Sequence, residues 1–320
     1  MINKNYINYS DLPENIEFKD EFKDIFHKME YSKENMFITG KAGSGKTTLL
    51  EYFRINSSKN FVILASTGIS AIKAKGKTIH SFFLFPPRIL INEKIQKLRG
   101  KVINNVETIL IDECSMIRSD VLDGIDQSLR FNRNNEQPFG GVQIILLGDI
   151  HQLPPVVREN EQEIFDNFYP FGHYFFHSNC YQISNIKKYE LKKVFRQKDI
   201  QFLDVLNKIR IGNVNEHDLS ILNNRVINNN SNIPLETIIL SPTNRKVDGI
   251  NRHNLENINQ ETFSYSSSET GDFKEKPADV TLQLKVGAQV MLIKNDTKLT
   301  TRWVNGSIGV VTELSKDNIH

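Results

Sequence analysis

The sequence is poor in the features that mark disulfide-rich, membrane-spanning and secreted proteins. It holds only two cysteines among 320 residues, and Cys114 and Cys180 form neither a CxxC pair nor a zinc site by themselves, so we expect reduced thiols. No apolar run approaches the roughly 18 residues that a membrane helix needs, and the first residues lack the apolar core of a signal peptide. These absences predict a protein of the cytoplasm, or of the nucleus or nucleoid, that is neither secreted nor inserted in a membrane.

An excess of charge of one sign is also missing, because 40 Lys and Arg residues face 38 Asp and Glu residues and the net charge is +2. Such a balance argues against nucleic-acid binding only when the charges are evenly spread. Here residues 71–101 carry eight bases and one acid, and residues 187–210 carry eight bases and three acids. Phosphate backbones respond to local basic surface. The two blocks therefore predict either nucleic-acid contacts or solvated helix faces, which the charges alone do not separate.

Short apolar runs define the expected fold. Four of them, at residues 36–38, 61–65, 109–111 and 142–147, are nearly continuous and are separated by segments long enough for crossover helices. This pattern is typical of parallel strands buried on both faces, and it predicts an α/β doubly wound domain over roughly residues 15–157. A further apolar run at residues 237–240 predicts the start of a second α/β unit, and a β pattern begins at residue 280. In such sheets, ligands bind at the carboxyl ends of the strands.

The string from Gly40 to Thr47 reads GKAGSGKT and matches the P-loop pattern GxxxxGK[ST]. An apolar run precedes it and a helix-like run follows it, as the motif requires. The glycines let backbone N–H groups converge on a phosphate, Lys46 can reach the β and γ phosphates, and Thr47 offers a hydroxyl to Mg²⁺. We therefore expect ATP and Mg²⁺ to be bound by Gly40, Ala42, Gly43, Ser44, Gly45, Lys46, Thr47 and Thr48.

Four further residues extend this site. Asp112 and Glu113 follow the third apolar run, and we assign Asp112 to Mg²⁺ and Glu113 as the base for the attacking water. Gln152 follows the fourth run and can sense the γ-phosphate. Arg196, in the string VFRQ, is a candidate arginine finger delivered from outside the first domain, although a lone Arg in a basic segment is also typical of a surface residue.

A P-loop alone leaves the substrate open. A guanine-reading NKxD loop is not matched by residues 207–210, whereas a small-molecule kinase stays open as an alternative. Residues 66–71 place hydroxyls after the second apolar run, which suits a phosphate contact. Residues 77–83 combine a base, hydroxyls and two phenylalanines, and aromatic rings stack on unpaired bases for about 1–3 kcal/mol each. These stretches favour single-stranded nucleic acid, with the rings serving the core as the alternative.

The motifs taken together resemble the petite-integration-frequency (PIF-type) DNA helicases of helicase superfamily one. The resemblance spans roughly residues 30–314 and rests on strings that occur in the family's order. They are GKAGSGKT, STGISA, TIHSFF, IDECSMI, PFGGVQ, GDIHQLPPV, VFRQ, SPTN and LKVGAQVML.

The resemblance implies two RecA-like domains, with residues 1–157 as the first, residues 158–290 as a partial second, and residues 291–320 as the start of an inserted small β-barrel. It implies an ATP-driven translocase that moves 5′ to 3′ on single-stranded DNA and opens duplex junctions. We also expect the chain to act as a monomer. The basic segment at about residues 84–105 matches the element that splits the duplex. By position, the DNA contacts would be Thr67, Gly68, His80, Phe82, Thr243 and Asn244.

The sequence departs from the family at both ends. Residues 1–30 contain no Gln, although the family usually reads adenine with a Gln upstream of the P-loop. The family's fifth and sixth motifs, with a second arginine finger, are expected beyond residue 320. We therefore expect a truncated chain. The alternative function for it is an ATP-regulated nucleic-acid-binding module without unwinding activity.

Overall fold

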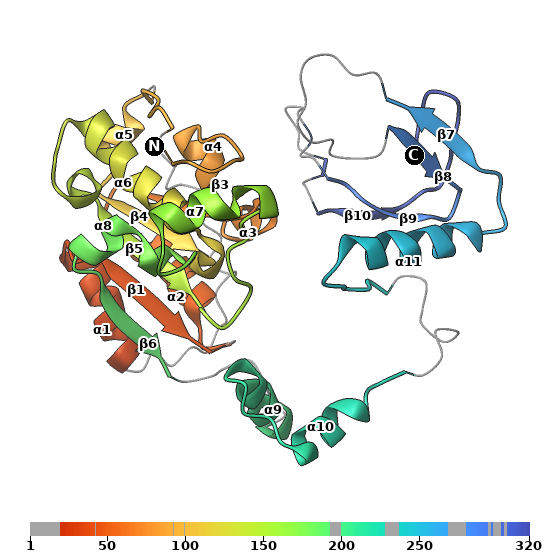
Figure 1. Ribbon diagram of the computed structural model, residues 1–320, viewed down its shortest axis with the longest axis horizontal. Helices are drawn as coiled ribbons and strands as arrows, with labels where there is room; N and C mark the ends of the chain where they lie inside the picture. The colour runs from red at the N-terminus through yellow and green to blue at the C-terminus, as the bar shows by residue number, and fades with distance from the viewer. Residues whose placement is uncertain are drawn as a thin grey trace. The chain divides into compact units, whose positions relative to one another are not determined.

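The computed structural model describes residues 20–41, 43–91, 93–98, 100–192, 200–227, 237–267, 280–293, 296, 302–303 and 306–320. The chain forms two compact units, residues 1–224 and residues 225–320, and each is described by itself (Figure 1). None of the described helices is long and apolar enough to cross a lipid bilayer.

A parallel sheet of six strands forms the centre of the first unit. Its strands are β1 (Met36–Gly40), β2 (Phe61–Ala65), β3 (Lys77–Thr78), β4 (Thr108–Asp112), β5 (Gln143–Gly148) and β6 (Lys187–Leu191). They lie in the order β3-β2-β4-β5-β1-β6, and each neighbouring pair is parallel. Ala65 pairs with Asp112 and Thr39 with Gly148, so the carboxyl ends of the central strands meet at one edge. This parallel α/β arrangement confirms the predicted fold class.

The four apolar runs of the first domain form β1, β2, β4 and β5, as predicted. Every residue of β1, β4 and β5 is buried, which explains why their sequences lack a polar face. β6 was not predicted, and it lies in the interval assigned to a second domain. It pairs with β1 through residues 36–40 and therefore extends the first sheet. The domain boundaries at residues 157 and 290 stay predictions.

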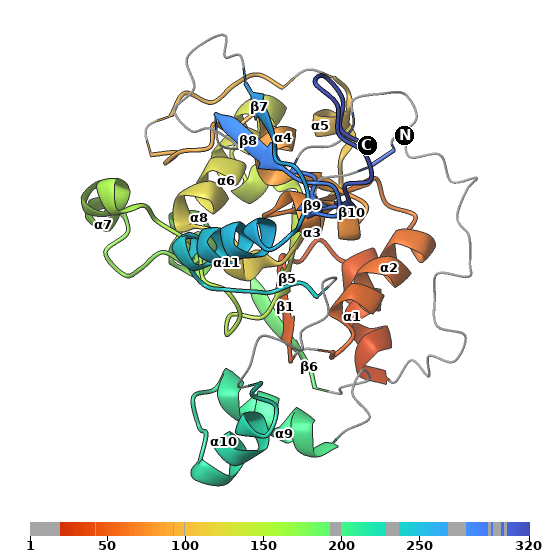
Figure 2. The ribbon, with the colours of Figure 1, turned by 90° about the vertical axis from the view of Figure 1, so that its right-hand side faces the viewer.

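Helices cover both faces of the sheet. On one face, α1 (Asp20–Tyr31) and α2 (Lys46–Asn56) bury Met29, Leu49 and Phe53 against the strands. On the other, α6 (Ser119–Arg133) and α8 (Asn179–Ile183) bury Leu122 and Cys180. Figure 2 shows the two pairs of helices on opposite sides of β1 and β5. The remaining helices of the first unit are α3 (Gly68–Lys73), α4 (Ile79–Phe83), α5 (Val102–Asn105), α7 (Gln162–Phe168), α9 (Ile200–Arg210) and α10 (Glu216–Asn223).

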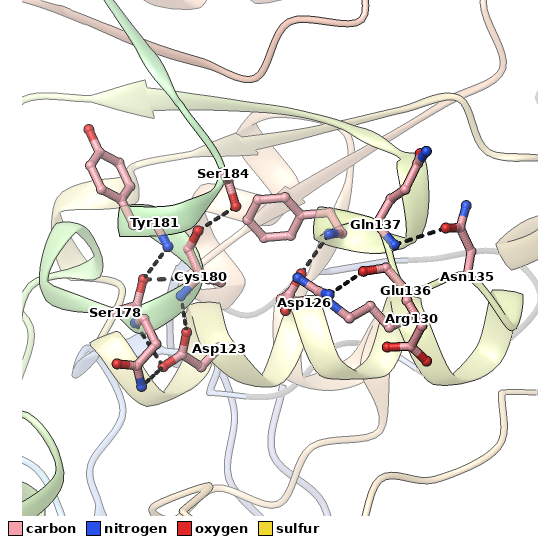
Figure 3. Close-up of polar contacts among 12 residues, drawn as sticks. Asp123, Asp126, Arg130, Asn135, Glu136, Gln137, Ser178, Cys180, Tyr181 and Ser184 are labelled. Atoms are coloured by element: carbon pink, nitrogen blue, oxygen red, sulfur yellow. Dashed lines mark hydrogen bonds and ion pairs between the residues drawn. The ribbon is translucent and has the colours of Figure 1, made fainter.

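Buried carboxylates on α6 hold neighbouring loops in place. Asp123 accepts a hydrogen bond from the Cys180 backbone N–H at 2.7 Å, and Asp126 accepts one from Phe139 N–H at 2.6 Å and pairs with Arg130 at 2.8 Å. Figure 3 shows these side chains on successive turns of the helix. Because each charge is hydrogen-bonded, its burial is tolerated, and α6 acts as a rigid support beside the site.

The second unit contains one described helix and two strand pairs. α11 (Asn244–Glu256) precedes the antiparallel pair β7 (Phe263–Ser266) and β8 (Thr281–Leu284), and β9 (Gln289–Met291) pairs antiparallel with β10 (Ile308–Val310). The β pattern expected from residue 280 onward is thus present. The strand expected at residues 237–240 is not formed, and Leu240 is 90% exposed. An apolar run becomes a strand only where neighbours pair with it and bury it, and within the described part of this unit no strand pairs with these residues.

Candidate nucleotide and nucleic-acid site

The P-loop lies between β1 and α2, at the carboxyl edge of the sheet. Gly43 and Gly45 have φ angles of 77° and 94°, values that glycine adopts without steric cost. This backbone course brings the loop round to the start of α2 at Lys46. The Lys46 ammonium donates hydrogen bonds to the carbonyls of Gly40 at 2.7 Å and Lys41 at 3.2 Å, so it lies over the loop, where a phosphate would sit. Ala42, also assigned to this site, lies outside the described residues.

The P-loop also holds a buried hydroxyl without a partner. Ser44 is 1% exposed, and its Oγ has no hydrogen-bond partner among the described residues. A Cβ at Gly40 would come within 2.5 Å of that oxygen and 2.7 Å of the Leu191 carbonyl. An unpaired buried hydroxyl is costly, and a bound phosphate would satisfy it. Thr47 and Thr48 occupy the first turn of α2 beside it, so the predicted phosphate-binding residues fit the ligand.

Asp112 and Glu113 lie at the end of β4, on the same edge of the sheet. Burial, followed by the nearby Glu113 carboxylate, raises the pKa of Asp112. Its Oδ1 accepts a hydrogen bond from Glu113 N–H at 3.0 Å. Glu113 itself has a left-handed backbone with φ 52°, an uncommon conformation for a residue with a side chain. The pair is therefore held in a strained turn directly after a buried strand.

Tight packing between this turn and β5 explains why position 114 is a cysteine and position 148 a glycine. Cys114 is fully buried, and burial raises the pKa of its thiol. A Cβ at Gly148 would meet the Cys114 Sγ at 2.7 Å. The cysteine is thus an inert packed residue. Gly148, the last residue of β5, lets the turn after β4 approach that strand.

Gln152 is exposed and lies in the turn after β5. Its backbone N–H donates to the Asp149 carbonyl at 2.9 Å. The Asp149 carboxylate, 1% exposed, pairs with Arg210 at the end of α9. Sequence reasoning gave neither Asp149 nor Arg210 a role. Asp149 belongs to the string GDIHQLPPV and directly follows a predicted strand. That position at the carboxyl end of a strand could have identified it as a site residue.

Several charged side chains lie near Lys46 and act on its ammonium group. Burial lowers the pKa of the Lys46 ammonium, and the carboxylates of Asp149, Glu113 and Asp112 oppose that shift. The site thus combines one partly buried ammonium with three carboxylates and the Arg210 guanidinium. Within the described part of the chain, no cluster of three or more His, Cys, Asp or Glu residues forms a self-sufficient metal site. A cation here would therefore also need phosphate or water oxygens, as Mg²⁺ commonly does.

The expected DNA contacts of the first unit lie on α3 and α4. Thr67 caps α3, because its side chain accepts a hydrogen bond from Ser70 N–H at 3.2 Å, and Gly68 is the first residue of that helix. His80 is half-buried, and burial with the nearby Arg118 lowers the pKa of its imidazole. Phe82 is partly buried against the core. It also borders an open cavity of about 940 Å³ that Lys94 and Lys97 line. The contact of this ring with unpaired bases stays a prediction.

The remaining predicted site residues lie in the second unit or outside the described residues. Thr243 and Asn244 are exposed at the start of α11, in the second unit. Arg196 lies outside the described residues.

Comparison with known proteins matches this arrangement to one family. The PIF1-like helicase family model matches residues 15–220, and a model of the DNA helicase Pif1 2B domain matches residues 275–314. The first match alone covers more than half of the chain. The chain belongs to the PIF1-like helicase family. The predicted family resemblance is confirmed.

Named relatives of the family align along most of the chain. An ATP-dependent DNA helicase PIF1 of Emericella nidulans is 31% identical over 303 residues, which cover 87% of this chain and 39% of the relative. An ATP-dependent DNA helicase Pif1 of Bdellovibrio bacteriovorus is 32% identical over 302 residues, covering 90% of this chain and 66% of the relative. The chain therefore spans between about a third and two thirds of the length of such helicases.

Solved structures of the family share the fold. A crystal structure of Bacteroides Pif1 bound to single-stranded DNA is 36% identical and has a TM-score of 0.81, covering 95% of this chain and 71% of that one. A Bacteroides Pif1 structure in complex with ADP-AlF3 and single-stranded DNA is 35% identical and has a TM-score of 0.79, covering 95% and 72%.

Proposed function

We propose that this chain is the nucleotide- and DNA-binding part of an ATP-dependent DNA helicase that moves 5′ to 3′ along single-stranded DNA. The observation that carries the proposal is the convergence of Lys46, the Asp112–Glu113 turn and the unpaired Ser44 hydroxyl at one edge of a parallel sheet. Membership of the PIF1-like helicase family, whose named relatives are ATP-dependent DNA helicases, supports the proposal.

Each residue of the site has a separate role in ATP hydrolysis. Backbone N–H groups of residues 43–47 and the Lys46 ammonium hold the β and γ phosphates. Thr47 and Asp112 would hold Mg²⁺, which supplies charge neutralisation at the phosphates. The Glu113 carboxylate takes a proton from the attacking water, and Gln152 orients that water. Arg196 neutralises charge that develops as the γ-phosphate leaves.

DNA would be bound by the first unit along α3, α4 and the basic segment at residues 84–105. The Thr67 hydroxyl and the backbone at Gly68 would contact phosphates, and His80 and Phe82 would offer rings to unpaired bases. From the second unit, Thr243 and Asn244 would add contacts. Action on duplex junctions, a monomeric state and a place in the cytoplasm, nucleus or nucleoid stay predictions.

ATP hydrolysis stimulated by single-stranded DNA tests the proposal. The rate is measured for this chain and for a chain extended through the family's sixth motif, each with and without a poly-dT oligonucleotide. We expect the oligonucleotide to raise the rate of the longer chain at least tenfold. Stimulation of the longer chain alone identifies residues 1–320 as a nucleotide-regulated DNA-binding module, whereas no stimulation of either chain would contradict the helicase function.

A further inference from the structure

One ion pair has no part in the proposed chemistry. It lies at the carboxyl edge of the sheet that carries the P-loop and the Asp112–Glu113 turn, here called the phosphate edge. The Arg210 Nε lies 2.8 Å from Asp149 Oδ2 and 3.1 Å from Oδ1, and the Nη2 lies 2.9 Å from Oδ1. The two side chains are 17% and 1% exposed. Burial alone would raise the pKa of Asp149, but the hydrogen bonds from Arg210 and from the His151 backbone lower it. A two-pronged contact of this kind fixes geometry as well as charge.

Asp149 organises the turn that presents Gln152. Its Oδ1 accepts a hydrogen bond from His151 N–H at 3.2 Å, and its carbonyl accepts one from Gln152 N–H at 2.9 Å. The residue thus binds the turn through its backbone and side chain at once. A shift of the Asp149 carboxylate would therefore also shift Gln152, the residue assigned to the γ-phosphate.

Arg210 anchors the far end of the helix that follows Arg196. It is the last residue of α9, which begins at Ile200, only four positions after Arg196. Figure 1 shows α9 beyond the ends to which β1 and β6 point. Elsewhere on α9, Lys208 pairs with Asp204 and with Asp218 of α10, which ties the helix to its neighbour and not to the sheet. The Asp149 contact is thus the described ion pair that links α9 to the phosphate edge.

The charge of the pair also matters to Lys46. The Asp149 carboxylate attracts the Lys46 ammonium, and the Arg210 guanidinium repels it. With Arg210 removed, the Asp149 carboxylate would be left buried without its ion-pair partner. Loss of Arg210 would therefore disturb turnover without removing any group that touches the nucleotide.

We propose that Asp149 and Arg210 are a positioning pair that locks the Gln152 turn to α9 and thereby fixes the position of Gln152. The inference rests on the proposed function for its catalytic consequence. The mechanical linkage between the turn and the helix is independent of that function.

Hydrogen–deuterium exchange on the full chain tests the linkage directly. Arg210→Gln is compared with Lys208→Gln, which breaks an ion pair on the same helix away from the sheet. We expect Arg210→Gln to speed exchange by about tenfold or more at both residues 150–153 and α9, and Lys208→Gln to change α9 and α10 alone. Unchanged exchange at residues 150–153 in Arg210→Gln would overturn the linkage.

Steady-state ATP hydrolysis by the chain extended through the sixth motif tests the consequence. Arg210→Gln should lower kcat by about tenfold or more while KM for ATP stays within about threefold, because misplacement of a catalytic group costs rate. Arg210→Lys should restore part of the loss. In the double variant with Gln152→Ala the two losses should not add, because Arg210 acts through the turn that presents Gln152.

The outcomes separate the two claims. Fully additive losses, or a rise in KM with unchanged kcat, would overturn the positioning role. Absence of hydrolysis in the unmutated extended chain would instead contradict the proposed function, and the exchange measurement still decides whether the pair locks the turn to the helix.

Discussion

At the scale of single residues, several residues of the phosphate edge lower the stability of the folded protein. Asp112 and Lys46 both have pKa values shifted toward their neutral forms by burial, and Glu113 has a left-handed backbone. A bound nucleotide with its cation would relieve the first two costs, because the phosphates attract the Lys46 ammonium and the cation attracts the Asp112 carboxylate. The strain is therefore an expected property of a site built for a charged ligand.

Asp112→Asn should raise the free energy of unfolding at pH 7. The folded-state pKa of Asp112 is raised, so the folded protein binds this proton more tightly than the unfolded chain and loses stability as pH rises through that pKa. The Asn Oδ1 can still accept the Glu113 N–H. Urea unfolding at pH 7 and near pH 4 measures the difference, which should shrink at the lower pH. A variant less stable than the unmutated protein at pH 7 would contradict this account.

Gly148→Ala should destabilise the protein by about 1–3 kcal/mol, the usual cost of overpacking. The new Cβ would meet Cys114 Sγ at 2.7 Å and the Cys114 backbone nitrogen at 2.9 Å. Gly249→Ala is the matched control, because that helical glycine has no atom within 4 Å of its added Cβ and alanine favours the helix by up to about 1 kcal/mol. Equal stability of Gly148→Ala and the unmutated protein in urea would refute the packing argument.

At the scale of elements, α3 depends on a threonine that is also assigned to DNA. The helix has six residues, and the Thr67 side chain caps it through Ser70 N–H. Thr78 caps the five-residue α4 through Ser81 N–H in the same way. Short helices gain much of their order from such caps, so the position of the proposed DNA-binding edge follows from its threonines.

Thr67→Ala should cost about 1 kcal/mol of stability and should weaken binding of a dT oligonucleotide measured by fluorescence anisotropy. Thr67→Ser keeps the cap and should retain both properties. Thr78→Ala removes the cap of α4, the helix that carries the other proposed DNA contacts, His80 and Phe82, so it should weaken binding as well. Unchanged DNA affinity in Thr67→Ala would contradict the assignment of Thr67 to DNA.

The sequence predicted the elements that are buried on both sides. β1, β4 and β5 have continuous apolar sequences because neighbours cover both faces. β6 escaped prediction because it is an edge strand whose Lys187, Lys188 and Glu190 are exposed, so its pattern resembles a loop. Residues 237–240 show the converse, since an apolar run without a pairing neighbour stays irregular.

The site divides in a similar way between local and distant signals. The P-loop and the Asp112–Glu113 turn are contiguous strings whose chemistry is visible in the residue types. The contact between Asp149 and Arg210 joins residues 61 positions apart. A local pattern carries no sign of such a pair, and only the fold brings its members together.

At the scale of the whole molecule, the net charge of +2 conceals local basic segments. Lys73, Lys75 and Lys77 lie on or near α3 and β3, and Lys94 and Lys97 line the open cavity next to Phe82. Single-stranded DNA would interact with these local basic residues, so the net charge of the whole chain does not determine its binding.

Affinity for a dT oligonucleotide should therefore fall steeply with salt. About four phosphate contacts predict a slope of log K against log[salt] of about −3. The slope is measured by anisotropy between low and moderate salt. Replacing Lys94 and Lys97 together with Gln should make the slope shallower, whereas a flat response in the unmutated protein would contradict a phosphate-contacting surface.

The central claim is that the carboxyl edge of the six-stranded sheet binds a nucleotide through Lys46. Titration of the full chain with fluorescent mant-ADP and Mg²⁺ tests it most directly, without requiring turnover or DNA. We predict saturable binding that weakens at least about tenfold in Lys46→Ala, because a hydrogen bond to a charged group contributes about 1.5–3 kcal/mol, and that is unchanged in Lys208→Gln. No saturable binding by the unmutated chain, or equal affinity in Lys46→Ala, would contradict the claim.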